Sequence, residues 1–233
     1  MLMEIHGIQK MTLLDYPGHV ACTLFFAGCD FRCPFCHNYE LACGRAEPVM
    51  DEEGLLAFLK KRVGLIDGVV FTGGEPALWP GLLRLAAEIK SLGYLVKLDT
   101  NGYHPETLDK LISSGNIDYV AMDIKGSPLK YAAVCGVDPE RFEFERIKKS
   151  IRLIMDSAPD YEFRTTVVGG IHEKEDFEFV GELIRGAKRY FLQAFEDRDT
   201  VPFSGFKTPD KVQILACAEL ARPFVQQIEI RNI

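Results

Sequence analysis

The chain has 233 residues, of which 47% are hydrophobic and 26% are charged, and its formal net charge is −7 at pH 7. This length is sufficient for one substantial hydrophobic core. The negative charge, without any stripe of lysine and arginine, argues against binding to a nucleic-acid backbone. No apolar run is long enough to span a membrane, and residues 1–10 lack the layout of a signal peptide. We therefore expect a cytoplasmic protein with no membrane partner.

Runs of β-branched and aromatic residues alternate along the chain with segments of helical period. The predicted strands lie at 20–26, 68–72, 95–100, 119–124, 161–168 and 189–195. The predicted helices lie at 52–63, 81–92, 105–114, 141–155, 175–185 and 209–220. Such alternation is typical of βα units around a parallel sheet, and six units are fewer than the eight of a closed (β/α)8 barrel.

Seven cysteines, an odd number, argue against a disulfide framework and indicate reduced thiols. Three of them lie in apolar contexts and are expected in the core: Cys22, Cys135 and Cys217. The sequence contains no internal repeat, low-complexity tract or long linker. It therefore predicts a single domain over residues 1–233, with a core at 18–196 and a C-terminal loop, helix and strand at 197–233.

Three other cysteines, Cys29, Cys33 and Cys36, follow the first predicted strand with Cys-x3-Cys-x2-Cys spacing. A cubane iron–sulfur cluster takes four cysteine ligands, so three on one loop would leave one iron open. An open coordination position is what catalysis at a metal requires. The alternative is a zinc site, completed by His37 or by Cys43.

This cysteine run, with aromatic Phe35 just before its last member, resembles the signature of radical S-adenosylmethionine (SAM) enzymes. The resemblance implies a [4Fe-4S] cluster on Cys29, Cys33 and Cys36, with SAM chelating the open iron through its amino and carboxylate groups. An electron from the cluster would then cleave SAM to a 5′-deoxyadenosyl radical. The family is known for an open six-unit barrel, so we expect an α/β fold, an open partial (β/α)6 barrel.

Polar residues follow the predicted strands, at the ends where such folds gather their functional groups. The second strand ends in Thr-Gly-Gly-Glu-Pro, where paired glycines let backbone approach a ligand and the glutamate can accept from an ammonium group. Taken alone, this is an ordinary glycine-rich turn. Beside the cysteine run it resembles the family's Gly-Gly-Glu-Pro motif, which binds the SAM amino group. The resemblance implies four cofactor-binding residues, Gly73, Gly74, Glu75 and Pro76.

The third predicted strand runs into an Asp-Thr-Asn-Gly segment that starts at Asp99, and the fourth carries Asp123 and Lys125 on one face. Alone, these are a turn signal and a surface ion pair worth roughly 0–1 kcal/mol. Together they resemble motifs of the activating enzymes of glycyl-radical enzymes. That resemblance implies SAM contacts for Asp99, Asn101, Asp123 and Lys125. It also implies a catalytic role for Lys125 at the SAM carboxylate or substrate backbone, and a Na⁺ or K⁺ ion near Asp99, Thr100 and Asp123.

Arg164 lies in a strand that is otherwise built to be buried, where an unpaired guanidinium is costly. It therefore needs an anionic partner, either a protein carboxylate or the carboxylate of SAM. The same subgroup carries an arginine at the start of its matching strand, which implies that Arg164 binds the cofactor.

Segment 12–18, together with Cys36-His37-Asn38, resembles activators of anaerobic (class III) ribonucleoside-triphosphate reductase, although Pro-Gly within 12–18 also fits a plain turn. His37 either donates to a cluster sulfide or packs structurally. Pyruvate formate-lyase activators place a SAM-binding histidine where this chain has Phe195, and Gln193 is a candidate substitute. Segment 42–68 lacks a ferredoxin-like insert, which disfavours activators of the glycerol-dehydratase or decarboxylase type.

The resemblance thus implies an enzyme that installs a glycyl radical on a partner, class III ribonucleotide reductase, using a flavodoxin or ferredoxin-type electron donor. Segment 196–208 is either a lid over the site or an ordinary loop. The alternatives are a pyruvate formate-lyase-type activator, and a radical SAM enzyme acting on a small molecule or peptide. A non-catalytic metal-binding or electron-transfer module would leave the motifs that follow the second to fourth predicted strands unexplained.

Overall fold

The computed structural model describes residues 4–231, and the remaining ends of the predicted domain 1–233 lie outside the described residues. Its main feature is one curved sheet of eight strands: β2 (Gly7–Thr12), β3 (Ala21–Phe26), β5 (Gly68–Gly73), β6 (Leu95–Thr100), β7 (Tyr119–Asp123), β8 (Tyr161–Val167), β9 (Tyr190–Ala194) and β10 (Ile228–Arg231). Two further strands, β1 (Glu4–Ile5) and β4 (Met50–Asp51), form a separate antiparallel pair.

The strand order across the sheet is β10-β9-β8-β7-β6-β5-β3-β2. All neighbours are parallel except β2, which runs antiparallel to β3. The two edge strands, β2 and β10, do not pair with each other, so the barrel stays open. This arrangement confirms the expected α/β fold with an open partial barrel.

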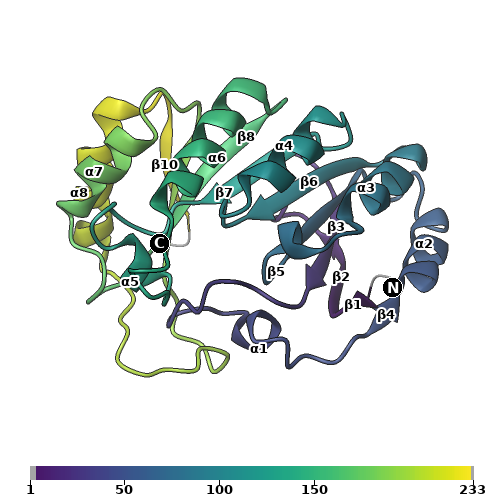
Figure 1. Ribbon diagram of the computed structural model, residues 1–233, viewed down its shortest axis with the longest axis horizontal. Helices are drawn as coiled ribbons and strands as arrows, with labels where there is room; N and C mark the ends of the chain where they lie inside the picture. The colour runs from purple at the N-terminus through teal and green to yellow at the C-terminus, as the bar shows by residue number, and fades with distance from the viewer. Residues whose placement is uncertain (1–3, 232–233) are drawn as a thin grey trace.

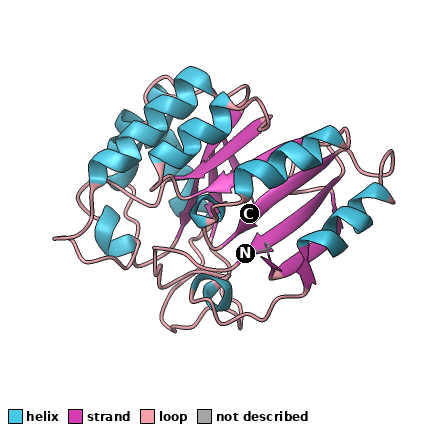
Figure 2. Ribbon diagram, turned by 45° about the vertical axis from the view of Figure 1, so that its right-hand side comes forward, coloured by secondary structure: helices cyan, strands magenta, loops and turns pink. Residues whose placement is uncertain are grey.

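Helices cover the outer face of the sheet (Figures 1 and 2). They are α2 (Glu52–Lys60), α3 (Leu82–Ser91), α4 (Pro105–Ser113), α6 (Phe144–Ser157), α7 (Asp176–Leu183) and α8 (Lys211–Ala221). Side-chain caps fix two of their starts, because Asp51 accepts from the backbone of Gly54 and Asp210 from that of Gln213. Among the described residues, no helix has the length and apolar character needed to cross a membrane.

The six predicted strands match β3 and β5–β9 to within one residue at either end. Cys22, Cys135 and Cys217 are buried, as expected. The sequence did not predict β2 or two short helices, α1 (Tyr39–Ala42) and α5 (Tyr131–Val134). Strand β2 pairs through its backbone while half of its residues are exposed, so it carries no strong alternation of apolar residues. The division into one domain stays a prediction.

The inner face of the sheet carries buried charges next to a small apolar cluster around Tyr119. Lys97 and Glu162 are each only 1% exposed there. Arg231 of β10 donates twice to Glu162, over 3.0 Å each, and Tyr119 Oη donates to the same carboxylate over 2.9 Å. Glu162 therefore joins the edge strand β10 to the interior of the barrel.

Replacing this carboxylate tests how much the interior pairing stabilises the fold. Glu162→Leu removes the buried carboxylate that Tyr119 and the half-buried Arg231 share, and we expect it to lower the free energy of unfolding by about 3–5 kcal/mol. Urea denaturation followed by circular dichroism measures the change. The control is Glu178→Leu on the exposed surface of α7, for which we expect about 0.5 kcal/mol or less. An equal loss of free energy of unfolding in the two variants would contradict a stabilising role for the Glu162 pairing.

Candidate active site

A cavity of about 270 Å³ lies at the C-terminal ends of the parallel strands. It brings together most residues that the sequence analysis singled out: Cys29, Cys33, Cys36, His37, Gly73, Gly74, Asp99, Thr100, Asn101, Asp123, Lys125, Arg164 and Gln193. These residues come from loops or strands that are far apart along the chain, and parallel strand order alone gathers them.

The three cysteines lie on the loop between β3 and α1. Its backbone is fixed at several points, among them Arg32 N to Cys135 O (2.8 Å) and Cys36 N to Cys33 O (3.1 Å). A hydrogen bond with Cys135 lowers the pKa of Cys33, against the effect of burial, and Lys125 lowers it further. Burial raises the pKa of Cys29 and of Cys36.

The described residues contain no group of three or more His, Cys, Asp and Glu side chains placed to hold a single metal ion. The zinc alternative therefore gains no support from the structure. Three thiols that line one cavity have the donor chemistry of an iron–sulfur cluster, which is larger than an ion and binds thiolates.

The loop rests directly on the end of β5. A Cβ atom on Gly74 would lie 2.1 Å from the carbonyl oxygen of Gly28, and one on Gly73, whose φ is 120°, would lie 2.4 Å from Phe26 N. Only glycine fits at these positions. Asn38 Nδ2 also donates to Gly73 O over 3.2 Å, so both glycines hold the cysteine loop against the sheet.

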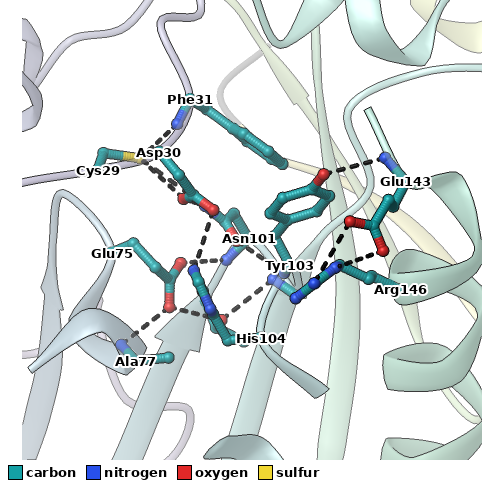
Figure 3. A network of polar contacts seen from close by, with 12 residues as sticks. Cys29, Asp30, Phe31, Glu75, Ala77, Asn101, Tyr103, His104, Glu143 and Arg146 are labelled. Carbon is teal, nitrogen blue, oxygen red and sulfur yellow. Dashed lines mark hydrogen bonds and ion pairs between the residues drawn. The ribbon is translucent and has the colours of Figure 1, made fainter. Parts of the chain in front are cut away.

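Glu75 does not line the cavity, but it is bonded to Asn101, which does (Figure 3). The fully buried carboxylate accepts hydrogen bonds from Ala77 N (3.0 Å), Thr100 Oγ1 (2.8 Å) and Asn101 N (2.7 Å). Burial raises its pKa to about 7, although these three bonds act to lower it. Pro76 is also buried, and a role of Glu75 and Pro76 at the SAM amino group stays a prediction.

A second network, which the sequence analysis missed, surrounds Asn101 (Figure 3). Asp30 accepts from Asn101 Nδ2 and contacts His104 Nε2, each over 3.0 Å, while Tyr103 N donates to Asn101 Oδ1 over 2.8 Å. Burial acts to raise the pKa of Asp30, but the contacts with His104 and Asn101 lower it overall. Asp30 directly follows the first cysteine, and this position was the only signal available in the sequence.

Four charged side chains form the wall opposite the glycines. Arg164 donates to Asp123 over 3.0 Å and to Asp99 over 3.3 Å, and Lys125 donates to Asp123 over 2.9 Å. Burial acts to raise the pKa of Asp123, but Lys125 and Arg164 lower it well below its usual range. Lys97, outside this cavity, also binds Asp99, and Arg164 lies 4.0 Å from Glu162, so each charge of the wall has an opposite charge beside it. Of the two anionic partners expected for Arg164, a protein carboxylate or the carboxylate of SAM, the protein carboxylates are thus present.

His172, also missed, supports Lys125 from behind. The backbone N–H of Val168 donates to Nδ1 over 3.0 Å, so the ring hydrogen lies on Nε2, which donates to Lys125 O over 2.8 Å. Burial lowers the pKa of His172, which keeps the ring neutral and this hydrogen bond intact.

His37 packs instead of standing free. Its ring stacks on Phe195 at 5.4 Å and 5°, and its Nε2 lies 2.7 Å from the carbonyl oxygen of Glu196. The following segment also contacts the cysteine loop, since Phe206 packs on Phe35 with ring centroids 6.4 Å apart. The cysteine loop is therefore in direct contact with segment 196–208 near both ends of that segment.

Comparison with known proteins agrees with this geometry. The family model described as "Radical SAM superfamily" matches residues 23–184. The chain belongs to the radical SAM superfamily. It is 31% identical over 236 residues to a protein of Methanocaldococcus jannaschii provisionally named as a glycyl-radical enzyme activating enzyme, a match that covers 98% of this chain and 96% of that one. This radical SAM enzyme is expected to use a [4Fe-4S] cluster and SAM, as the family does.

Two more similarities are partial. The pyruvate formate-lyase-activating enzyme of Clostridium pasteurianum is 34% identical over 130 residues, about half of either chain (52%). The crystal structure of a domain of pyruvate-formate lyase-activating enzyme from Bacteroides vulgatus superposes with a TM-score of 0.57 at 22% identity, over 71% of this chain and 99% of that one. The second similarity concerns the fold alone.

The raised pKa of Glu75 predicts a pH dependence of stability. A carboxyl whose pKa rises on folding stabilises the fold most when protonated, and this contribution is lost as the pH rises from 4.5 through about 7. The free energy of unfolding of the wild type relative to Glu75→Gln should fall by about 2 kcal/mol between about pH 5.5 and about pH 8.5. Urea titrations at a series of pH values measure this difference.

The matched control is Glu140→Gln, at an exposed position, whose difference from the wild type should not change with pH. A difference for Glu75→Gln that stays constant, or grows with pH, would mean that Glu75 is ionised throughout this range.

Proposed function

We propose that this radical SAM enzyme installs a glycyl radical on a partner enzyme. The observation that carries the proposal is one cavity in which three thiols face a wall of Lys125, Arg164 and two carboxylates. The full-length similarity to a protein named as a glycyl-radical enzyme activating enzyme supports the reaction class.

In this proposal Cys29, Cys33 and Cys36 hold the cluster, and SAM occupies the remaining cavity. Gly73 and Gly74 bring backbone groups beside the cysteine loop, where they can bind the SAM amino group. The ammonium of Lys125 and the guanidinium of Arg164 have several N–H donors each, which suits them to bind the SAM carboxylate. When bound, the two cofactors supply one-electron cleavage chemistry that leads to abstraction of a hydrogen atom from the glycine Cα.

The chain's own residues fix the charged groups of the site. Asp123 holds Lys125 and Arg164 in place, and His172 fixes the backbone of Lys125. Because these groups are already oriented, binding SAM needs little rearrangement of charge. A Na⁺ or K⁺ ion at Asp99, Thr100 and Asp123 would compete with Arg164 for the two protein carboxylates. The proposal therefore places the carboxylate of SAM beside Lys125 and Arg164 and includes no cation.

For the partner we propose anaerobic (class III) ribonucleoside-triphosphate reductase, with a flavodoxin or ferredoxin-type electron donor. The support is the resemblance of segment 12–18 and of Cys36-His37-Asn38 to activators of that enzyme. A pyruvate formate-lyase-type partner is the second candidate, favoured by the similarity to the Clostridium pasteurianum activator.

Cys33→Ala tests the cluster assignment. After anaerobic reconstitution, we expect the variant to lose the reduced [4Fe-4S] signal that SAM perturbs in electron paramagnetic resonance (EPR). We also expect 5′-deoxyadenosine formation with dithionite to fall to background. Cys43→Ala is the control, because Cys43 completes the four-cysteine zinc alternative but does not line the cavity. Intact SAM cleavage in Cys33→Ala would refute the mechanism.

The partner is tested with the reconstituted wild type and each candidate enzyme in turn. We expect an EPR signal of a glycyl radical with anaerobic ribonucleotide reductase, and formation of 5′-deoxyadenosine in equal amount. A radical on pyruvate formate-lyase alone would instead select the second candidate. SAM cleavage without a radical on either protein would favour a small-molecule or peptide substrate.

A further inference from the structure

A second cavity, of about 550 Å³, lies deeper in the barrel and meets the first at three shared residues, Asp99, Arg164 and Gln193. Its other walls include segment 13–17, which follows β2, and Arg231 of β10. We name it the seam chamber, because β2 and β10 are the two unpaired edges of the sheet.

The three shared residues differ in whether their side chains already have a partner within the protein. Asp99 binds Lys97 and Arg164, and Arg164 also binds Asp123. Gln193 is partly exposed, and its side-chain amide has no hydrogen-bond partner among residues 4–231. A carboxamide offers one acceptor and two donor hydrogens, which match the N–H and C=O of a peptide. The unpaired amide thus faces the junction of the two cavities.

The seam determines which kind of ligand can reach this amide. Because β2 and β10 do not pair, the lumen is open from the side as well as from its mouth, so an internal segment of a polypeptide can lie in it while both its ends stay outside. Leu13 and Leu14, which line the seam chamber, are 73% and 88% exposed. Such exposed apolar side chains are typical of a protein-contact surface.

We propose that the seam chamber holds the glycine-bearing loop of the partner enzyme and that Gln193 hydrogen-bonds the peptide backbone beside the target glycine. The inference rests on the proposed function and adds where the substrate enters and which residue orients it. Gln193 pairs in register with Arg231 of β10, so it lies one strand from the open edge. The cysteine loop follows β3, which lies next to β2, the edge strand at the other end of the strand order.

The segment that forms the other border of the seam is itself fixed. Asp15 accepts a hydrogen bond from Thr23 Oγ1 of β3 over 2.6 Å, and Leu14 N donates to Thr12 Oγ1 over 3.1 Å. The two leucines are thus presented on an ordered turn. A preformed apolar surface next to a polar chamber suits a segment with apolar side chains and an unpaired backbone.

The test compares Gln193→Leu with Gln213→Leu, an exposed position on α8 far from either cavity lining. With the partner that the wild type activates, we measure the partner concentration at half-maximal rate of glycyl-radical formation. Separately, we measure the SAM concentration that half-saturates the change in the EPR signal of the reduced cluster. Loss of the amide should raise the half-saturating concentration of the partner (the partner value) about tenfold. It should raise the half-saturating concentration of SAM (the SAM value) less, while Gln213→Leu changes neither concentration.

A SAM value that rises as much as the partner value, or more, would assign Gln193 to the cofactor and overturn the proposal, as would no change in either value. The second comparison is Leu14→Asp against Val212→Asp, which is 77% exposed on α8. Only Leu14→Asp should raise the partner value. If the wild type forms no radical on either candidate partner, the proposed function itself has failed, which is a result distinct from failure at Gln193.

Discussion

The site depends on a contact between two stretches of backbone. The cysteine loop can lie where it does only because Gly73 and Gly74 carry no side chain, since any Cβ there would overlap Phe26 or Gly28. The backbone of Gly28 accepts from Glu75 N over 2.8 Å at the same place. The carboxylate of Glu75 then reaches across to the end of β6. One four-residue segment therefore sets the positions of the loop and of two neighbouring strand ends.

The buried charges follow from this geometry. Strands β6, β7 and β8 carry Asp99, Asp123 and Arg164, which lie too deep for water to solvate them fully. Each therefore requires an opposite charge nearby, and Arg164 supplies it to Asp123 on the adjacent strand and to Asp99 two strands away. The same pairing that offsets desolvation fixes the side chains in place. In the proposed function, the amino and carboxylate groups of SAM would meet donors and acceptors that are already oriented.

Much of this could be read from the sequence, because the six inner strands are apolar runs and the motifs stand at their ends. What the sequence could not give is contact between distant segments. Asp30 and His104 are separated by 74 positions and form one network. His172 reaches Lys125 from a loop with no motif of its own. The edge strand β2 escaped prediction because it is stabilised by backbone pairing, which leaves no hydrophobic pattern.

The polar interior and the open edge are two aspects of one feature. A closed barrel fills its lumen with layers of branched apolar side chains, which water never reaches. Here the lumen contains Lys97, Glu162 and Arg164, and the antiparallel direction of β2 sets one border of an opening that β10 does not close. The apolar side chains at this opening, Leu13 and Leu14, remain in contact with water, whereas Lys97 and Glu162 inside it are buried and each is paired with an opposite charge. Pairing therefore lets charged side chains occupy a lumen that strand pairing leaves open on one side.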